Sequence, residues 1–180
     1  MEDQLTVNWH SPSAHCEGKS LTIDLRTAKE SDQDFLFSVY ASTRADEMNL
    51  VDWNDLQKDA FLRMQFDAQT KHYLLHYPSA QYKIIERAGV SLGRLIVEDR
   101  GDHFLIMDIA LLPEYRRMGI GTFLIQELKQ EAIRLNLPLV LRVEFFNPAI
   151  RLYDRLGFVK TREVNTVYHE MVWAPHSNES

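Results

Sequence analysis

Between residues 103 and 145, the sequence passes from an apolar strand pattern to an amphipathic helix pattern and back again. The three segments are His103–Leu112, Gly119–Leu135 and Leu139–Phe145. In the middle segment, apolar residues recur at three- and four-residue intervals opposite a polar face, as in a helix that covers a sheet. Two strands that one helix connects lie parallel, and their crossover is right-handed. These residues therefore predict a βαβ unit inside an α/β (α+β) domain.

Strand and helix patterns on both sides of this unit complete the order β-α-α-β-β-β-α-β-α-β-β. The further strands are expected at Leu21–Leu25, Tyr82–Glu86, Val90–Glu98, Val159–Val164 and Val167–Trp173. The further helices are expected after a capping box at Thr27–Glu30, over Trp53–His76 with an apolar side of Leu56, Ala60, Phe61, Met64 and Ala68, and over Pro148–Leu156. Short turns join the strands between residues 82 and 112, which predicts an antiparallel meander.

Length and charge narrow the class of protein. The 180 residues suit one domain, which we place at residues 20–174, between a flexible arm (1–19) and a tail (175–180). The 20 Lys and Arg residues against 26 Asp and Glu residues give a net charge of −6, which argues against a nucleic-acid partner. The chain starts without a signal-peptide pattern and has no apolar run long enough for a membrane span. We therefore expect a cytoplasmic protein without a membrane partner.

The residues that typically bind metals form no recognisable pattern. Cys16 is the single cysteine, so it cannot form an internal disulfide or a cysteine metal cluster. His72 and His76 have helical i,i+4 spacing, but no further ligand lies near them in the sequence. We expect no metal site.

The segment Pro113–Thr122 joins the central strand to the central helix and contains Gly119 and Gly121. Glycines at a helix start let the backbone approach a ligand, and the amides of the first turn have no acceptor inside the helix. Such a helix start is an anion site suited to a pyrophosphate, with Arg116 and Arg117 adding positive charge. The alternative is a glycine turn beside solvated arginines.

Two other nucleotide-binding motifs fit this segment less well. A Walker loop needs a lysine after its second glycine, where this chain has Thr122. The dinucleotide fingerprint needs a third glycine where this chain has Leu124.

Two motifs together resemble the GCN5-related N-acetyltransferase (GNAT) superfamily. Family members carry Arg/Gln-x-x-Gly-x-Gly/Ala at the start of the central helix, and Arg116, Gly119 and Gly121 match this pattern. The downstream residues Asn147 and Tyr153 and the Leu156-Gly157-Phe158 segment also match. The resemblance implies a mixed, mostly antiparallel central sheet of about seven strands with a splayed parallel pair, flanked by about four helices.

The resemblance also implies an acetyl-CoA site in the V-shaped slot between the splayed strands. Backbone groups of the strand before the loop would pair with the pantetheine arm, the loop would wrap the pyrophosphate, and an asparagine would contact the pantetheine. The implied cofactor-binding residues are Ile109, Ala110, Leu111, Arg116, Arg117, Met118, Gly119, Ile120, Gly121, Thr122 and Asn147. Tyr153 would lie close to the thioester sulfur.

A tyrosine near the sulfur can act as a general acid. When an amine attacks a thioester, charge develops on the departing sulfur, and a phenol can return a proton to it. Proton transfer of this kind contributes about 10²–10⁴-fold to a rate. The alternative for Tyr153 is a core residue in an apolar helix stripe.

The incoming amine must lose a proton, and the central strand offers His103 and Asp108 as candidate bases or amine-positioning groups. Five residues apart on a regular strand, they would face opposite sides, so at most one should meet the substrate. We favour Asp108 as catalytic, because it lies nearer the cofactor stretch. Its alternatives are a solvated charge or a partner for a neighbouring arginine, and ordered water is a third route for the proton.

The sequence thus predicts an N-acetyltransferase that moves an acetyl group from acetyl-CoA to a primary amine by direct attack in a ternary complex. The amine belongs to a small molecule or to a protein or peptide. Residues Ala41–Asn54, between the early helices, should shape its site. Two alternatives remain: a module that binds acyl-CoA without turnover, and an acyltransferase for longer acyl chains. A homodimer through the terminal strands is also left open.

Overall fold

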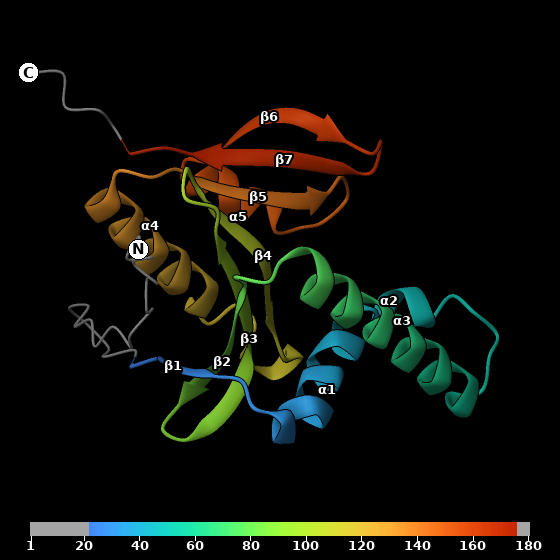
Figure 1. The fold of residues 1–180 in the computed structure, drawn as a ribbon. Coiled ribbons are helices and arrows are strands. Elements are labelled where there is room, and N and C mark those ends of the chain that lie inside the picture. The colour runs from blue at the N-terminus through green and yellow to red at the C-terminus, as the bar shows by residue number, and fades with distance from the viewer. Residues whose placement is uncertain (1–21, 176–180) are drawn as a thin grey trace, which may run out of the picture.

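The computed structural model describes residues 22–175, and Figure 1 shows its fold. The arm expected over residues 1–19 lies outside this range, as do Cys16 and all but the first residue of the expected tail. Seven strands form one sheet in the order β1-β2-β3-β4-β5-β7-β6, in which β4 and β5 are parallel and all other neighbours are antiparallel. The strands are β1 Asp24–Thr27, β2 Gln81–Arg87, β3 Val90–Asp99, β4 Phe104–Leu111, β5 Leu139–Glu144, β6 Val159–Val164 and β7 Tyr168–Trp173.

Helices cover both faces of this sheet (Figure 1). The α-helices are α1 Gln33–Thr43, α2 Ala45–Met48, α3 Asp55–His76, α4 Ile120–Leu135 and α5 Ile150–Arg155, and the 3₁₀ turns are η1 Glu30–Asp32 and η2 Pro113–Tyr115. On one face, α4 and α5 pack with the strands in the larger core, which includes Phe104, Leu124 and Tyr153. On the other face, α1 and α3 form a smaller core with Phe37 and Phe66.

The central part of the chain folds as its pattern predicts. The antiparallel meander of β2, β3 and β4 and the parallel β4–α4–β5 unit are both present. The apolar stripe of α4 is buried because Ile120, Leu124, Leu128 and Ala132 lie on the side that faces the sheet. The predicted fold class is therefore confirmed.

The N-terminal helices differ from their predicted patterns. The first capping box lies at Lys29 and Asp32 rather than at Thr27–Glu30, because the chain makes a 3₁₀ turn before α1. In α3, Leu56 and Met64 are 83% and 60% exposed. The side that α3 buries contains Leu62 and Phe66, because only its middle packs on α1. A stripe of apolar residues is thus a weak guide in a helix that packs on one neighbour.

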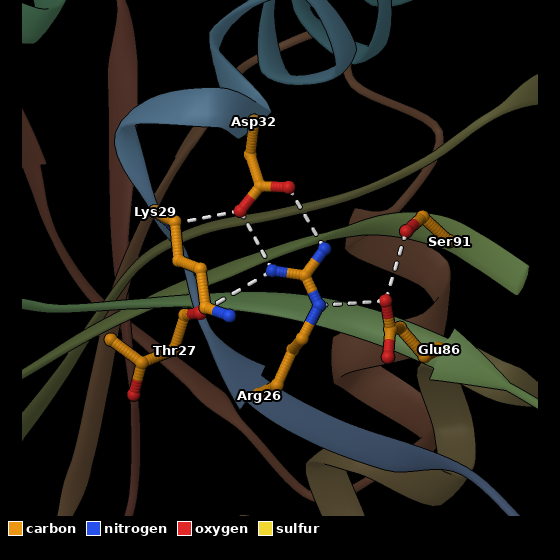
Figure 2. Close-up of polar contacts among 6 residues, drawn as sticks. All are labelled: Arg26, Thr27, Lys29, Asp32, Glu86 and Ser91. Atoms are coloured by element: carbon orange, nitrogen blue, oxygen red, sulfur yellow. Dashed lines mark hydrogen bonds and ion pairs between the residues drawn. The ribbon is translucent and has the colours of Figure 1, made fainter. Parts of the chain in front are cut away.

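One ion-pair network fixes the N-terminal edge of the sheet (Figure 2). Arg26 on β1 donates from Nε to Glu86 on β2 at 2.7 Å, and its two terminal nitrogens donate to both carboxylate oxygens of Asp32 at 2.7 and 2.8 Å. The same carboxylate accepts the amide of Lys29 at 2.7 Å, and Ser91 on β3 donates to Glu86 at 3.0 Å. Hydrogen bonding to Arg26 lowers the pKa of Asp32 to about 2. The guanidinium of Arg26 therefore joins β1 to η1 and β2, and Glu86 extends the network to β3.

Candidate active site

A slot opens between the parallel strands β4 and β5. The two strands pair only where Phe104–Ile106 face Leu139–Leu141. Beyond that point β4 continues to Leu111 and β5 to Glu144, but the two strands no longer pair with each other. The β5 side of the last β4 residues is therefore open backbone that an extended ligand could pair with. This is the splayed pair that the resemblance implies, and it includes Ile109, Ala110 and Leu111.

A β-bulge in β4 turns Asp108 to a new face. In the register with β3, Asp108 faces Ile96 and Ile106 faces Val97, so Met107 is an extra residue. Ile106 points into the core with α4, which leaves Asp108 on the face covered by α1 and α3. The prediction that His103 and Asp108 face opposite sides is therefore wrong, because a regular strand was assumed.

His103 nevertheless lies far from the open part of the slot. It precedes the first residue of β4, and its Nδ1 is 2.6 Å from an oxygen of Asp102 in the preceding turn. Asp108 lies beyond the point at which β4 and β5 separate. Of the two candidate bases, only Asp108 therefore lies on the open stretch of β4.

Asp108 is held by a buried arginine. Arg94 on β3 donates to Oδ2 of Asp108 from Nε at 2.6 Å and from Nη2 at 2.5 Å. Arg94 has a side-chain exposure of 6%, against 23% for Asp108. Among residues 22–175, Oδ1 of Asp108 has no partner. The alternative that Asp108 pairs with a neighbouring arginine is therefore confirmed, and Oδ1 is still available to a substrate.

The loop before α4 presents a row of unpaired amides. In the described part of the chain, the backbone N–H groups of residues 117–122 have no acceptor, and Phe123 is the first to donate, to Gly119 O at 2.9 Å. Two of these residues, Arg117 and Gly119, have left-handed backbones with φ of 61° and 83°. Such alternating backbone turns amides toward one side and makes a nest for an anion. The dipole of α4 adds partial positive charge at the same place.

Packing within the protein does not explain the second glycine of this loop. A Cβ added to Gly121 would meet only Leu152 Cδ2 at 3.7 Å, an ordinary contact. A Cβ on Gly119 would meet nothing within 4 Å, although its positive φ would strain any other residue. A bulky side chain at residue 121 would therefore crowd what approaches this loop from outside the protein.

The two arginines of the loop have different surroundings. Arg116 donates from Nε to Leu111 O at 2.8 Å and from Nη2 to Ser42 Oγ at 3.0 Å. Its side chain therefore joins the end of β4 to the end of α1. Arg117 is exposed and has no ion pair within residues 22–175, so it is the cation that an incoming anion can use.

Tyr153 is the buried polar group of α5. Its side chain lies in the larger core, and its ring meets Phe158 edge-on with 5.8 Å between centroids. Burial, followed by the negative charge of Asp108, raises the pKa of its hydroxyl above the usual tyrosine range. The hydroxyl has no hydrogen-bond partner in the described residues. Asp108 lies on β4, and Tyr153 lies on α5, which follows β5. This electrostatic interaction therefore links one residue from each side of the slot.

Asn147 lies between β5 and α5. Its Oδ1 accepts the amide of Ala149 at 2.9 Å, which shapes the turn into α5. The side chain is exposed, and its Nδ2 group has no partner within residues 22–175. Asn147 therefore retains a free donor at the end of β5.

Sequence reasoning missed Arg94, Met107 and the short helix α2. The signal for Arg94 was an arginine inside the apolar run Leu92–Val97, where a charge needs a partner. Helix α2 lies in the expected acceptor segment 41–54, where Arg44 pairs with Glu47 at 3.1 Å and with Glu144 on β5 at 3.5 Å.

The described residues contain neither a cluster of metal-ligand side chains nor a membrane-spanning helix. No group of three or more His, Cys, Asp or Glu side chains in residues 22–175 is arranged to hold a metal. No helix in this range combines the length and apolar character of a membrane span.

Comparison with known proteins identifies the family. A sequence model of the "Acetyltransferase (GNAT) family" matches residues 40–158. The chain therefore belongs to this family, and the predicted resemblance is confirmed.

The chain is also similar to a curated protein and to solved structures. The "Cysteine-rich protein 2-binding protein" of Mus musculus is 29% identical over 106 residues, which are 58% of this chain and 13% of that protein. The PaiA N-acetyltransferase of Thermoplasma acidophilum, solved "in complex with coenzyme a", has a TM-score of 0.66 at 14% identity and covers 86% of this chain and 100% of its own. The ribosomal-protein-S18-alanine N-acetyltransferase of Escherichia coli has a TM-score of 0.55 at 18% identity, covering 88% and 98%. At these identities, the two structures show the fold.

Proposed function

We propose that this protein transfers an acetyl group from acetyl-CoA to a primary amine of a small molecule, peptide or protein, by direct attack in a ternary complex. The observation that carries this proposal is the row of unpaired amides at residues 117–122, which lies where the open β4 edge meets α4. Support comes from the family and from the PaiA structure, which contains coenzyme A.

The cofactor would bind through the backbone. Its pyrophosphate accepts hydrogen bonds from the amides of residues 117–122 and faces the side chain of Arg117. Its pantetheine arm extends along Ile109–Leu111, where β4 lacks a partner on the β5 side. Nδ2 of Asn147 can donate to an amide carbonyl of that arm. Along this path, the thioester would lie between Asp108 and Tyr153.

The reaction balances with groups that lie beside this path. The amine nitrogen forms a bond to the acetyl carbon, the carbon–sulfur bond breaks, and the amine proton leaves as CoA takes up one proton. Tyr153 donates a hydrogen bond to the departing sulfur. Oδ1 of Asp108 positions the amine, since Oδ2 is held by Arg94. Because both reactants are held together, positioning supplies much of the acceleration.

A matched pair of glycine variants tests the cofactor site. Gly119 and Gly101 both have φ of +83° with nothing near an added Cβ, so Ala at either position costs about 1–2 kcal/mol of stability from backbone strain. Only Gly119→Ala should weaken CoA binding, about 10-fold or more, because it disturbs charge-assisted hydrogen bonds. Gly121→Leu should also weaken CoA binding, because a bulky side chain there would fill the space from which a ligand approaches. The measurement is calorimetric titration with CoA.

The result that contradicts the proposal is equally specific. If Gly119→Ala and Gly121→Leu bind CoA as Gly101→Ala does, the pyrophosphate does not lie on these amides. A screen of amines, polyamines and peptides with free-thiol detection then identifies the acceptor. Tight CoA binding with no thiol release from any amine would instead favour a binding module without turnover.

A further inference from the structure

A second hollow lies on the other side of β3 from the slot. It has a volume of about 230 Å³ and lies between α1 and α3 on one side and β2 and β3 on the other. It is lined by Ala28, Lys29, Glu30, Gln33, Leu36, Phe66, Gln69, Thr70, Tyr73, Leu74, Tyr82, Arg94 and Ile96. None of the residues assigned to acetyl-CoA lines it, so it is separate from the proposed cofactor path.

Two polar groups in this hollow lack partners. The hydroxyl of Tyr82 is buried and has no hydrogen-bond partner among the residues that the structure describes. Arg94 uses Nε and Nη2 for Asp108 and Nη2 for Gln69 at 3.4 Å, while its Nη1 has no partner in that range. Burial raises the pKa of Tyr82, so its hydroxyl remains a donor at neutral pH. A buried donor without an acceptor costs free energy that a bound acceptor recovers.

The two unpartnered groups select the chemistry of a ligand. A guanidinium nitrogen and a phenol both donate, and Lys29 adds a cation at the rim, although Glu30 lies there as well. A planar carboxylate can accept from both donors at once. The surrounding wall is largely apolar, with Leu36, Phe66 and Ile96, so a dianion such as phosphate would lose more hydration than these donors replace.

We propose that this hollow binds a small organic carboxylate with an apolar body, its carboxylate on Arg94 and Tyr82 and its body against Leu36, Phe66 and Ile96. The volume lies below the roughly 300 Å³ at which pockets for drug-sized ligands begin, so the body is one ring or one short chain. This site is outside the proposed cofactor path but shares Arg94 with the proposed acetyl transfer, because the same guanidinium holds Asp108.

Benzoate, with benzamide and benzylamine as probes of equal shape, tests the proposal on the full chain. Benzoate should bind saturably and shift the amide resonances of Gln69, Thr70 and Tyr82 in ¹⁵N-correlated spectra, while benzamide and benzylamine should not. Tyr82→Phe should weaken benzoate about tenfold. Its melting temperature should not fall, because the hydroxyl that it removes makes no hydrogen bond in the described structure. Tyr77→Phe, outside the hollow, is the matched control.

A second variant keeps the test independent of Tyr82. Leu74 lies at the hollow and is 61% exposed, so Leu74→Trp can narrow the opening without disturbing the core, and it should also weaken benzoate. Three results would each overturn the proposal: no saturable binding of benzoate or hexanoate at millimolar concentration, equal binding of benzylamine, or unchanged benzoate affinity in Tyr82→Phe. CoA titration of the same samples reports on the slot separately.

Discussion

Replacing Tyr153 with Phe tests the chemistry of the slot with the smallest change available. The hydroxyl has no hydrogen-bond partner among the described residues, and the ring remains packed on Phe158, so the fold should keep its stability. The change therefore removes a donor from the site and leaves the rest in place.

The size of the effect follows from the surroundings of the hydroxyl. A hydrogen bond to an ionised group contributes about 1.5–3 kcal/mol, which corresponds to about 10–150-fold in rate. Full proton transfer is less favourable here, because burial raises the pKa of Tyr153 while a free thiol has a pKa of about 8.5. We therefore expect kcat to fall by about 10–150-fold, toward the low end of general acid catalysis, with an unchanged Kd for CoA.

The assay is thiol release from acetyl-CoA with the acceptor that the amine screen identifies, measured from pH 6 to pH 10. Since the raised pKa keeps the phenol protonated, the wild-type rate should show no alkaline loss assignable to Tyr153 in that range. An alkaline limb near pH 10 that disappears in Tyr153→Phe would refute the burial argument. An unchanged kcat would refute the role of the hydroxyl. Tyr77→Phe, remote from the slot, serves as the control.

Two stability predictions concern the frame of the sheet. Asp32 has a folded pKa of about 2, below its unfolded value near 3.8, so its pairing with Arg26 stabilises the protein above pH 4 and is lost as the pH falls toward 2. In urea unfolding at pH 7, Asp32→Asn should lower the free energy of unfolding by about 1–2 kcal/mol, a value reduced for solvent screening around the partly exposed Arg26. At pH 2 the same variant should cost almost nothing. An equal cost at both pH values would contradict this prediction. Gly93→Ala would place a Cβ 2.1 Å from Ala110 O, so it should destabilise the protein by about 1–3 kcal/mol and weaken CoA binding, whereas Gly89→Ala should show backbone strain alone. Retained stability and CoA affinity in Gly93→Ala would show that β3 and β4 can separate without cost.

Elements with strong local patterns could be predicted from the sequence. Helix α4 follows its apolar stripe, and the glycine spacing of residues 119–121 locates its start within one residue. Helix α3 shows the limit: Leu62 and Phe66 are buried because α1 packs there, which is a fact about a distant segment. The pairing of Arg94 with Asp108 likewise depends on the register between β3 and β4, which no local pattern specifies.

Met107 connects the two halves of the candidate site. If Met107 were paired as in a regular strand, Asp108 would share a face with Ile106 and point into the core under α4. A bulge also bends and twists its strand, and pairing with β5 ends at Ile106, the residue before the bulge. The insertion therefore accounts for both the divergence of β4 from β5 and the turn of Asp108 toward Arg94. One irregularity thus provides both an open backbone edge for the cofactor and a carboxylate for the amine. A regular strand in its place would remove both features together.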